Sequence, residues 1–70
     1  MAKRKVVVRV AKRVPGVELL RIAHNGAVSD DEKVQNAAAS IYSLIALQLT
    51  EEMVGIPQPM MPFYKVLLKA

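Results

Sequence analysis

Cysteine and tryptophan are absent from this chain of 70 residues, and histidine occurs only once. Without cysteine the chain can form neither a disulfide bond nor a thiolate metal site. One histidine cannot build a histidine metal cluster unless a symmetric oligomer supplies further copies. We therefore expect neither a metal ion nor another cofactor.

Glycine and aromatic residues are scarce as well. The three glycines are scattered, so they form no phosphate-binding loop of the kind that nucleotide-binding enzymes use. The single histidine, His24, lies in a His-Asn-Gly stretch that is typical of a turn, and the nearby Ser29 is suited to capping a helix. The sequence thus predicts a protein that is not an enzyme.

The chain is short, and it is rich in apolar residues for its size. Hydrophobic residues make up 53% of the composition, whereas a domain of this length buries only about 60–65% of the surface of its unfolded chain. Small domains without disulfides or metals often gain stability by association. We therefore expect a single domain, residues 1–70, that forms a homo-oligomer.

The net charge of +4 is unevenly distributed along the chain. Residues 1–24 hold seven cations and one acid, residues 25–54 hold one cation and five acids, and residues 55–70 hold two cations. The corresponding net charges are +6, −4 and +2. A basic first third beside an acidic middle indicates a charged partner.

No segment resembles a signal peptide or a membrane span. Arg9, Lys12 and Arg13 interrupt the apolar residues that follow the basic start, which excludes an ordinary signal peptide. The longest nearly apolar run, residues 37–49, is shorter than the roughly 20 residues that cross a bilayer. We therefore expect a cytoplasmic protein, or a component of a particle assembled in the cytoplasm, with no membrane partner.

Two strands are predicted in the first third of the chain. Residues 6–14 are dense in valine, which favours a strand, and alternation places most cations on the face opposite the valines. A basic amphipathic helix is the alternative interpretation of this segment. Pro15 and Gly16 then indicate a turn, and residues 17–23 a second strand. A hairpin loop of odd length, or a bulge, best matches the apolar faces of the two strands.

A long helix is predicted for residues 30–54. Ser29 and Glu32 have the spacing of a capping box at its start, where acidic side chains are also stabilising. Gly55 and Pro57 mark its end. The middle of the helix is apolar around more than half of its circumference, which is more than one small sheet can cover.

Residues 55–62 contain three prolines and are predicted to form an extended connector, and the alternating residues 63–70 a third strand. The fold class that follows is α+β, in the order β-β-α-β. We expect a three-stranded, mostly antiparallel sheet with the strand order 3-1-2 and the long helix packed on one face. A right-handed crossover that places the third strand beside the second is the alternative.

The sheet face away from the helix would carry most of the cations. Arginine and lysine on such a surface neutralise phosphates, so salt-sensitive binding of DNA or RNA is the first functional hypothesis. The protein would then be a non-enzymatic, oligomeric binding module. The predicted nucleic-acid-binding residues are Lys3, Arg4, Lys5, Arg9, Arg13, Arg21, Lys65 and Lys69.

The alternative hypothesis is a structural subunit of a larger particle, such as a small virion protein, that binds other subunits and no nucleic acid. The apolar helix and the two open sheet edges would then hold neighbouring copies together. In either case the helix would supply the contact between copies. The predicted interface residues are Ile41, Leu44, Leu47, Glu51, Glu52 and Met53.

Overall fold

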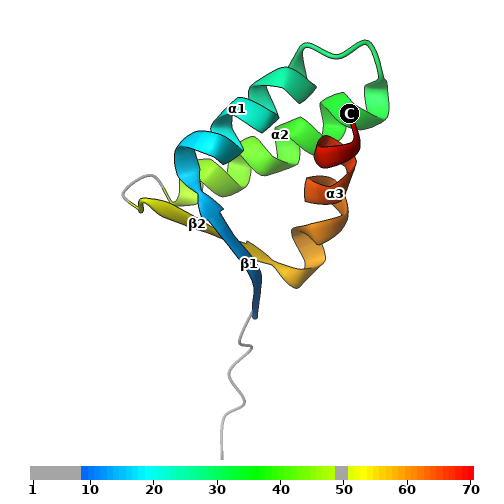
Figure 1. Ribbon diagram of the computed structural model, residues 1–70. Helices are drawn as coiled ribbons and strands as arrows, with labels where there is room; N and C mark the ends of the chain where they lie inside the picture. The colour runs from blue at the N-terminus through cyan, green and yellow to red at the C-terminus, as the bar shows by residue number, and fades with distance from the viewer. Residues whose placement is uncertain (1–8, 49–50) are drawn as a thin grey trace, which may run out of the picture.

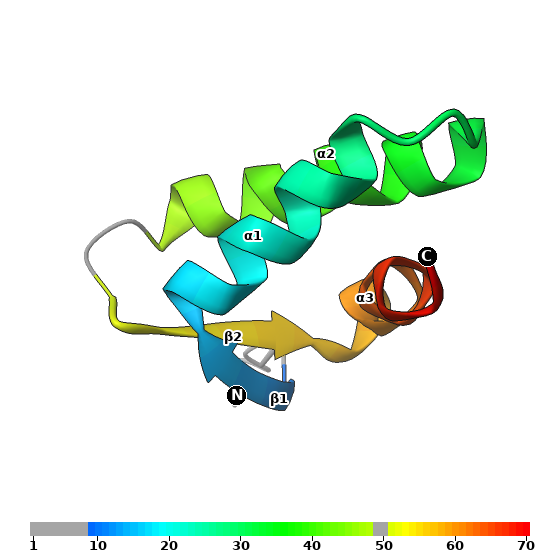
Figure 2. The same ribbon diagram turned by 45° about the horizontal axis from the view of Figure 1, so that its top comes forward.

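The computed structural model describes residues 9–48 and 51–70. In this part of the chain three α-helices and one short 3-10 helix are combined with two strands. Figures 1 and 2 show the first two helices as an antiparallel hairpin on one side of the sheet, with the third helix against the second. In chain order the elements are β1 (Val10–Pro15), α1 (Gly16–Ala27), α2 (Glu32–Leu47), β2 (Met53–Pro57), η1 (Gln58–Met60) and α3 (Met61–Lys69).

The predicted arrangement of three strands and one long helix is wrong. The described residues form a two-stranded antiparallel sheet and three α-helices. The predicted second strand, residues 17–23, lies within α1, and the predicted third strand, residues 63–70, falls almost wholly within α3. The predicted helix over residues 30–54 ends at Leu47, and β2 takes up its last two positions and the start of the expected connector. Neither predicted strand order therefore applies.

Helix α1 forms because its apolar residues recur at helical spacing. Leu19, Ala23 and Gly26 face inward and are buried. Pro15 ends β1 in an extended conformation (φ −58°, ψ 131°) and directly precedes the first helical residue. The Pro-Gly pair therefore marks a corner between a strand and a helix, where a hairpin turn was predicted. The predicted His-Asn-Gly turn is likewise helical.

Helix α2 begins at a different cap from the predicted one. The Asp31 side chain accepts a hydrogen bond from the backbone N–H of Lys33 (2.9 Å), which makes Asp31 the N-cap. The Ser29 hydroxyl accepts the backbone N–H of Asp31 (3.1 Å), and the Ser29 carbonyl accepts from the side-chain amide of Gln35. The last turn of α2 contains no basic residue, and Glu51 and Glu52 follow it. A helix that continued to residue 54 would place these two acids at the negative end of its dipole, where they are destabilising.

The two strands pair antiparallel, with Val14 opposite Val54 and Lys12 opposite Ile56. A bulge near the start of β1 shifts the register there. Val14, Val54 and Ile56 are buried beneath the helices, so the inward face of this short ribbon is apolar. The predicted strand over residues 6–14 overlaps β1, and its first three residues lie outside the described residues.

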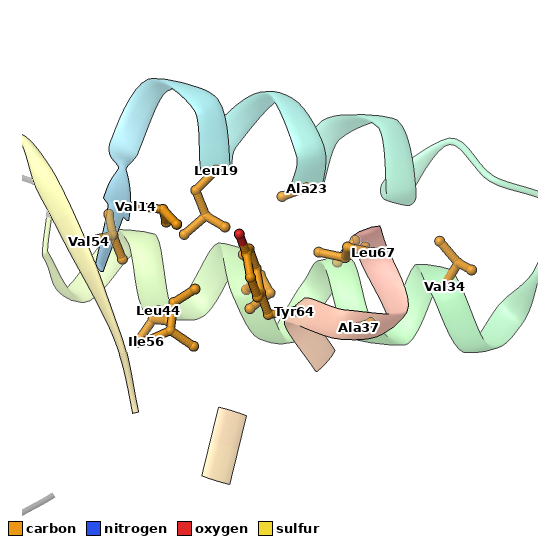
Figure 3. Close-up of a cluster of buried hydrophobic side chains, with 12 residues drawn as sticks. Val14, Leu19, Ala23, Val34, Ala37, Leu44, Val54, Ile56, Tyr64 and Leu67 are labelled. Carbon is orange, nitrogen blue, oxygen red and sulfur yellow. The ribbon is translucent and has the colours of Figure 1, made fainter. Parts of the chain in front are cut away.

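The hydrophobic core lies between the helical hairpin, the sheet and α3, as Figure 3 shows. Leu19 of α1, Ile41 of α2 and Ile56 of β2 are completely buried. The described residues include no buried polar or charged side chain, so the core is held by apolar packing. Its members are Val14, Leu19, Ala23, Val34, Ala37, Ala38, Ile41, Leu44, Val54, Ile56, Tyr64 and Leu67.

Helix α1 packs tightly against both other helices at Gly26. A Cβ atom on Gly26 would collide with the Leu67 side chain, and it would lie 3.2 Å from Cβ of Ala38 and 3.3 Å from Cγ1 of Val34. Ala23, one turn earlier on α1, is also completely buried. The close approach of the helices favours glycine at residue 26, and the φ of Gly26 is not positive.

We expect Gly26→Ala to lower the free energy of unfolding, because overpacking a filled core costs about 1–3 kcal/mol. The better helix propensity of alanine, roughly 0.5–1 kcal/mol, would offset only part of this cost. Gly16→Ala is the matched control, since a Cβ atom there meets its nearest neighbour, the carbonyl oxygen of Glu52, at 3.5 Å. Urea denaturation measures both variants, and a Gly26→Ala protein as stable as the control would contradict the tight junction.

Candidate functional site

Strand β1 and the residue before it carry three exposed cations. Arg9 directly precedes the strand, Lys12 and Arg13 lie within it, and all three are exposed. Lys12 is opposite Ile56 and Arg13 is opposite Gly55, so these two neighbouring side chains point to opposite faces of the ribbon. The strand contains no acidic residue. We call Arg9, Lys12 and Arg13 the basic strand.

The outer edge of β2 is closed by a side chain. The Gln48 Nε2 donates to the carbonyl oxygen of Gly55 (3.0 Å), and the backbone N–H of Gly55 donates to Oε1 of Gln48 (2.9 Å). The Gln48 amide thus pairs with Gly55 as a neighbouring strand would, and Pro57 at the end of β2 has no N–H to offer. Gly55 directs its N–H and C=O away from β1, and Arg13 is the residue opposite it. In an antiparallel pair the N–H and C=O of Arg13 therefore point away from β2, toward the outer edge of β1.

The predicted nucleic-acid-binding residues do not share one sheet face. Arg9 and Arg13 remain together in the basic strand, but Arg21 is exposed on α1, and Lys65 and Lys69 are exposed on α3. The predicted face is absent because α3 packs on α2 as a helix and does not extend the sheet. Three further predicted residues lie outside the described residues: Lys3, Arg4 and Lys5.

The predicted interface residues are divided between the core and the surface. Ile41 is completely buried and Leu44 is 7% exposed, so both pack inside their own chain and have no surface to offer a partner. Their burial follows from the helical hairpin, because α1 and α3 cover the face of α2 that the predicted sheet could not cover. The residues that keep exposed or half-buried surface are Leu47, Glu51, Glu52 and Met53.

The sequence pattern did not reveal an apolar groove between the start of α1 and the end of α2. The groove has a volume of about 260 Å³ and is lined by Val17, Leu20 and Ile45, together with Glu51 and Glu52. Val17 is 84% exposed. The signal for this groove is the three-residue spacing of Val17 and Leu20, which joins them on one face only if the segment is a helix.

Neither metal chemistry nor similarity to a known protein points to a reaction. The described residues contain no group of three or more histidine, cysteine or acidic side chains placed to hold a metal ion. Across residues 9–48 and 51–70, every helix is too short or too polar to cross a membrane. Comparison of the chain with protein-family models, curated proteins and solved structures finds no match. The basic strand and the apolar groove are therefore the features from which a function can be argued.

We expect Gln48→Glu to destabilise the fold by about 1–3 kcal/mol, because a carboxylate cannot donate to the Gly55 carbonyl and leaves that oxygen without its partner. In the Gln48→Glu variant, slow exchange of the Gly55 amide hydrogen would indicate that its hydrogen bond to residue 48 survives, and fast exchange would indicate that the bond is lost. Denaturation and hydrogen exchange measure the two effects. Gln58→Glu, at an exposed glutamine after β2, is the control, and equal stability of the two variants would show that the Gln48 pairing contributes nothing.

Proposed function

We propose that the protein is a non-enzymatic binding module that works as a small homo-oligomer and contacts the phosphates of DNA or RNA through its basic strand and the segment before it. The observation that supports this most directly is the joint exposure of Arg9, Lys12 and Arg13 on β1 and the residue before it, a stretch without acidic residues. Three more cations lie within the first five residues, so the first 13 residues hold six cations and no acid. Its proposed location is the cytoplasm or a particle assembled there.

The dimensions of the basic strand suit a phosphate backbone. An extended chain rises about 3.3 Å per residue, so Arg9 and Arg13 are separated by at most roughly 13 Å. One DNA strand rises about 3.4 Å per phosphate, so this length corresponds to about four phosphates. Arginine can bind a phosphate through two parallel hydrogen bonds, and the exposed ammonium group of Lys12 adds positive charge beside Arg13.

The aromatic residues favour binding that does not depend on base sequence. Tyr64 is buried in the core, and Tyr42 and Phe63 are half-buried beside it. Recognition of single-stranded bases usually requires exposed aromatic rings on which the bases stack. Contacts to phosphates position a protein on nucleic acid without reading its sequence, so we propose a mode of binding that is governed by charge.

A structural subunit of a larger particle is the second candidate, and a different observation supports it. Val17 on α1 and Leu47 on α2 are more than four-fifths exposed, at 84% and 83%. Apolar side chains that lie this far out of the core suit surfaces that neighbouring subunits cover. In this role the protein would bind copies of itself or other subunits, and the cations would not contact nucleic acid.

Replacing Arg9, Lys12 and Arg13 together by glutamine should weaken binding to mixed-sequence DNA and RNA at low salt. Each lost phosphate contact lowers the slope of log affinity against log salt by roughly 0.7–0.9, so the triple variant should lose about 2–3 from the magnitude of this slope. Fluorescence anisotropy with labelled duplex DNA and single-stranded RNA over a salt series measures both the affinity and the slope.

The matched control is Lys65→Gln combined with Lys69→Gln, because both lysines are exposed on α3, away from the basic strand. This control should keep most of the affinity. An unchanged slope in the triple variant, or an equal loss in the control, would argue against phosphate contacts at β1. A parent protein that forms large assemblies free of nucleic acid and binds neither DNA nor RNA at low salt would favour the second candidate.

A further inference from the structure

Helix α1 has apolar side chains on two faces. Leu19, Ala23 and Gly26 face the core, whereas Val17 and Leu20 face outward with 84% and 46% of their surfaces exposed. Both outward side chains line the apolar groove, whose other wall belongs to α2. A helix that is apolar on a second face usually buries that face against another element or a partner. Within the described residues this face remains exposed, so a partner is expected to cover it.

Charges of opposite sign lie at the two ends of this outward face. Glu51 and Glu52 line the groove at the start of α1, and they are held there because the backbone N–H of Gly16 donates to the Glu52 carbonyl (2.9 Å). Arg21 is exposed and follows Val17 by four residues, so it lies one turn farther along the same face. The face therefore runs from acidic, through apolar, to basic along the axis of α1.

We propose that this face is the interface of a symmetric homodimer in which the two α1 helices pack antiparallel. A twofold axis midway between Val17 and Leu20 would bring Val17 of each copy against Leu20 of the other at the centre. Arg21 of each copy would then face Glu51 and Glu52 of the other. This interface gives a structural form to the self-association proposed above, and it does not depend on the binding of phosphates.

The order of charges identifies a second copy as the partner. In a twofold dimer the same patch is used on both subunits, so every contact between two different residues occurs twice. When two copies of this face pack against each other after a rotation of 180°, the acidic end of each copy meets the basic end of the other. A uniformly acidic or uniformly basic partner would satisfy one end and repel the other. The basic strand does not line the groove, so it would stay accessible in both copies.

The apolar centre is tested with the double variant Val17→Gln and Leu20→Gln. Glutamine favours a helix at least as well as valine, so α1 should be retained, and thermal unfolding followed by circular dichroism verifies this. We expect the double variant to raise the dissociation constant of the dimer by roughly tenfold or more. Leu47→Gln is the control, because Leu47 is equally exposed but lies on α2 outside the groove. Sedimentation equilibrium without nucleic acid measures all three proteins.

The charged ends are tested by exchange of charges. Arg21→Glu alone, and Glu51→Lys with Glu52→Lys alone, place like charges opposite each other at both ends, so each protein should dimerise more weakly than the parent. A mixture of the two proteins restores opposite charges at both ends and should form the heterodimer in preference to either homodimer. Native mass spectrometry of an isotopically labelled mixture distinguishes the three species.

A parent chain that stays monomeric at every attainable concentration would overturn the proposal, and so would a dimer that the glutamine substitutions leave intact. A dimer that those substitutions disrupt, but whose charge-exchanged chains do not prefer each other, would overturn the antiparallel arrangement. These measurements contain no nucleic acid. Their failure is therefore distinct from the failure of phosphate binding, which the variants of the basic strand test separately.

Discussion

The close packing of small residues between α1 and α2 is the constraint on which the fold depends. Ala23 and Gly26 of α1 and Ala38 of α2 are all buried, and their lack of bulk lets the two helices lie against each other. Leu67 of α3 occupies the space that a side chain on Gly26 would take. An isolated two-stranded ribbon is at best marginally stable in water. Here the helical hairpin covers the apolar face of the ribbon, so the sheet depends on the helix junction.

The sequence allowed some local elements to be predicted and others not. The valine-rich strand and the middle of α2 were recognisable because β-branched density and a long helical period are strong local signals. Residues 17–23 were assigned to a strand because the Pro-Gly pair before them suggested a hairpin. The same segment contains leucine, glutamate, arginine and alanine, all good helix formers. In a short apolar run these signals conflict, and packing against α2 decides the outcome.

Only the part of the candidate site that is formed by residues close together in the sequence could be predicted. Arg13 lies on β1 and Arg9 directly precedes it, so their proximity follows from the local sequence. Lys65 and Lys69 would join these arginines on one face only if residues 63–70 formed a third strand. This segment instead falls almost wholly within α3, whose Tyr64 and Leu67 face the core at a helical spacing. The pairing of a glutamine side chain with β2 depends on tertiary geometry that no sequence periodicity encodes. The spacing of Val17 and Leu20 indicates the apolar groove only once their segment is known to be helical.

The two edges of the sheet are the reason that we place the proposed self-association on α1 and not on the strands. Gln48 closes the edge of β2 by hydrogen bonding to Gly55, and Pro57 lacks an N–H there. Among the described residues no strand pairs with the outer edge of β1. A second β1 paired against it would bring the cations of both copies close together, and cations are a common protection of edge strands. A polyanion is the partner that would relieve this repulsion. The two proposals thus use surfaces of different charge: phosphates would bind the basic strand, which would repel a second basic strand, and a second copy would pack on the α1 face of mixed sign.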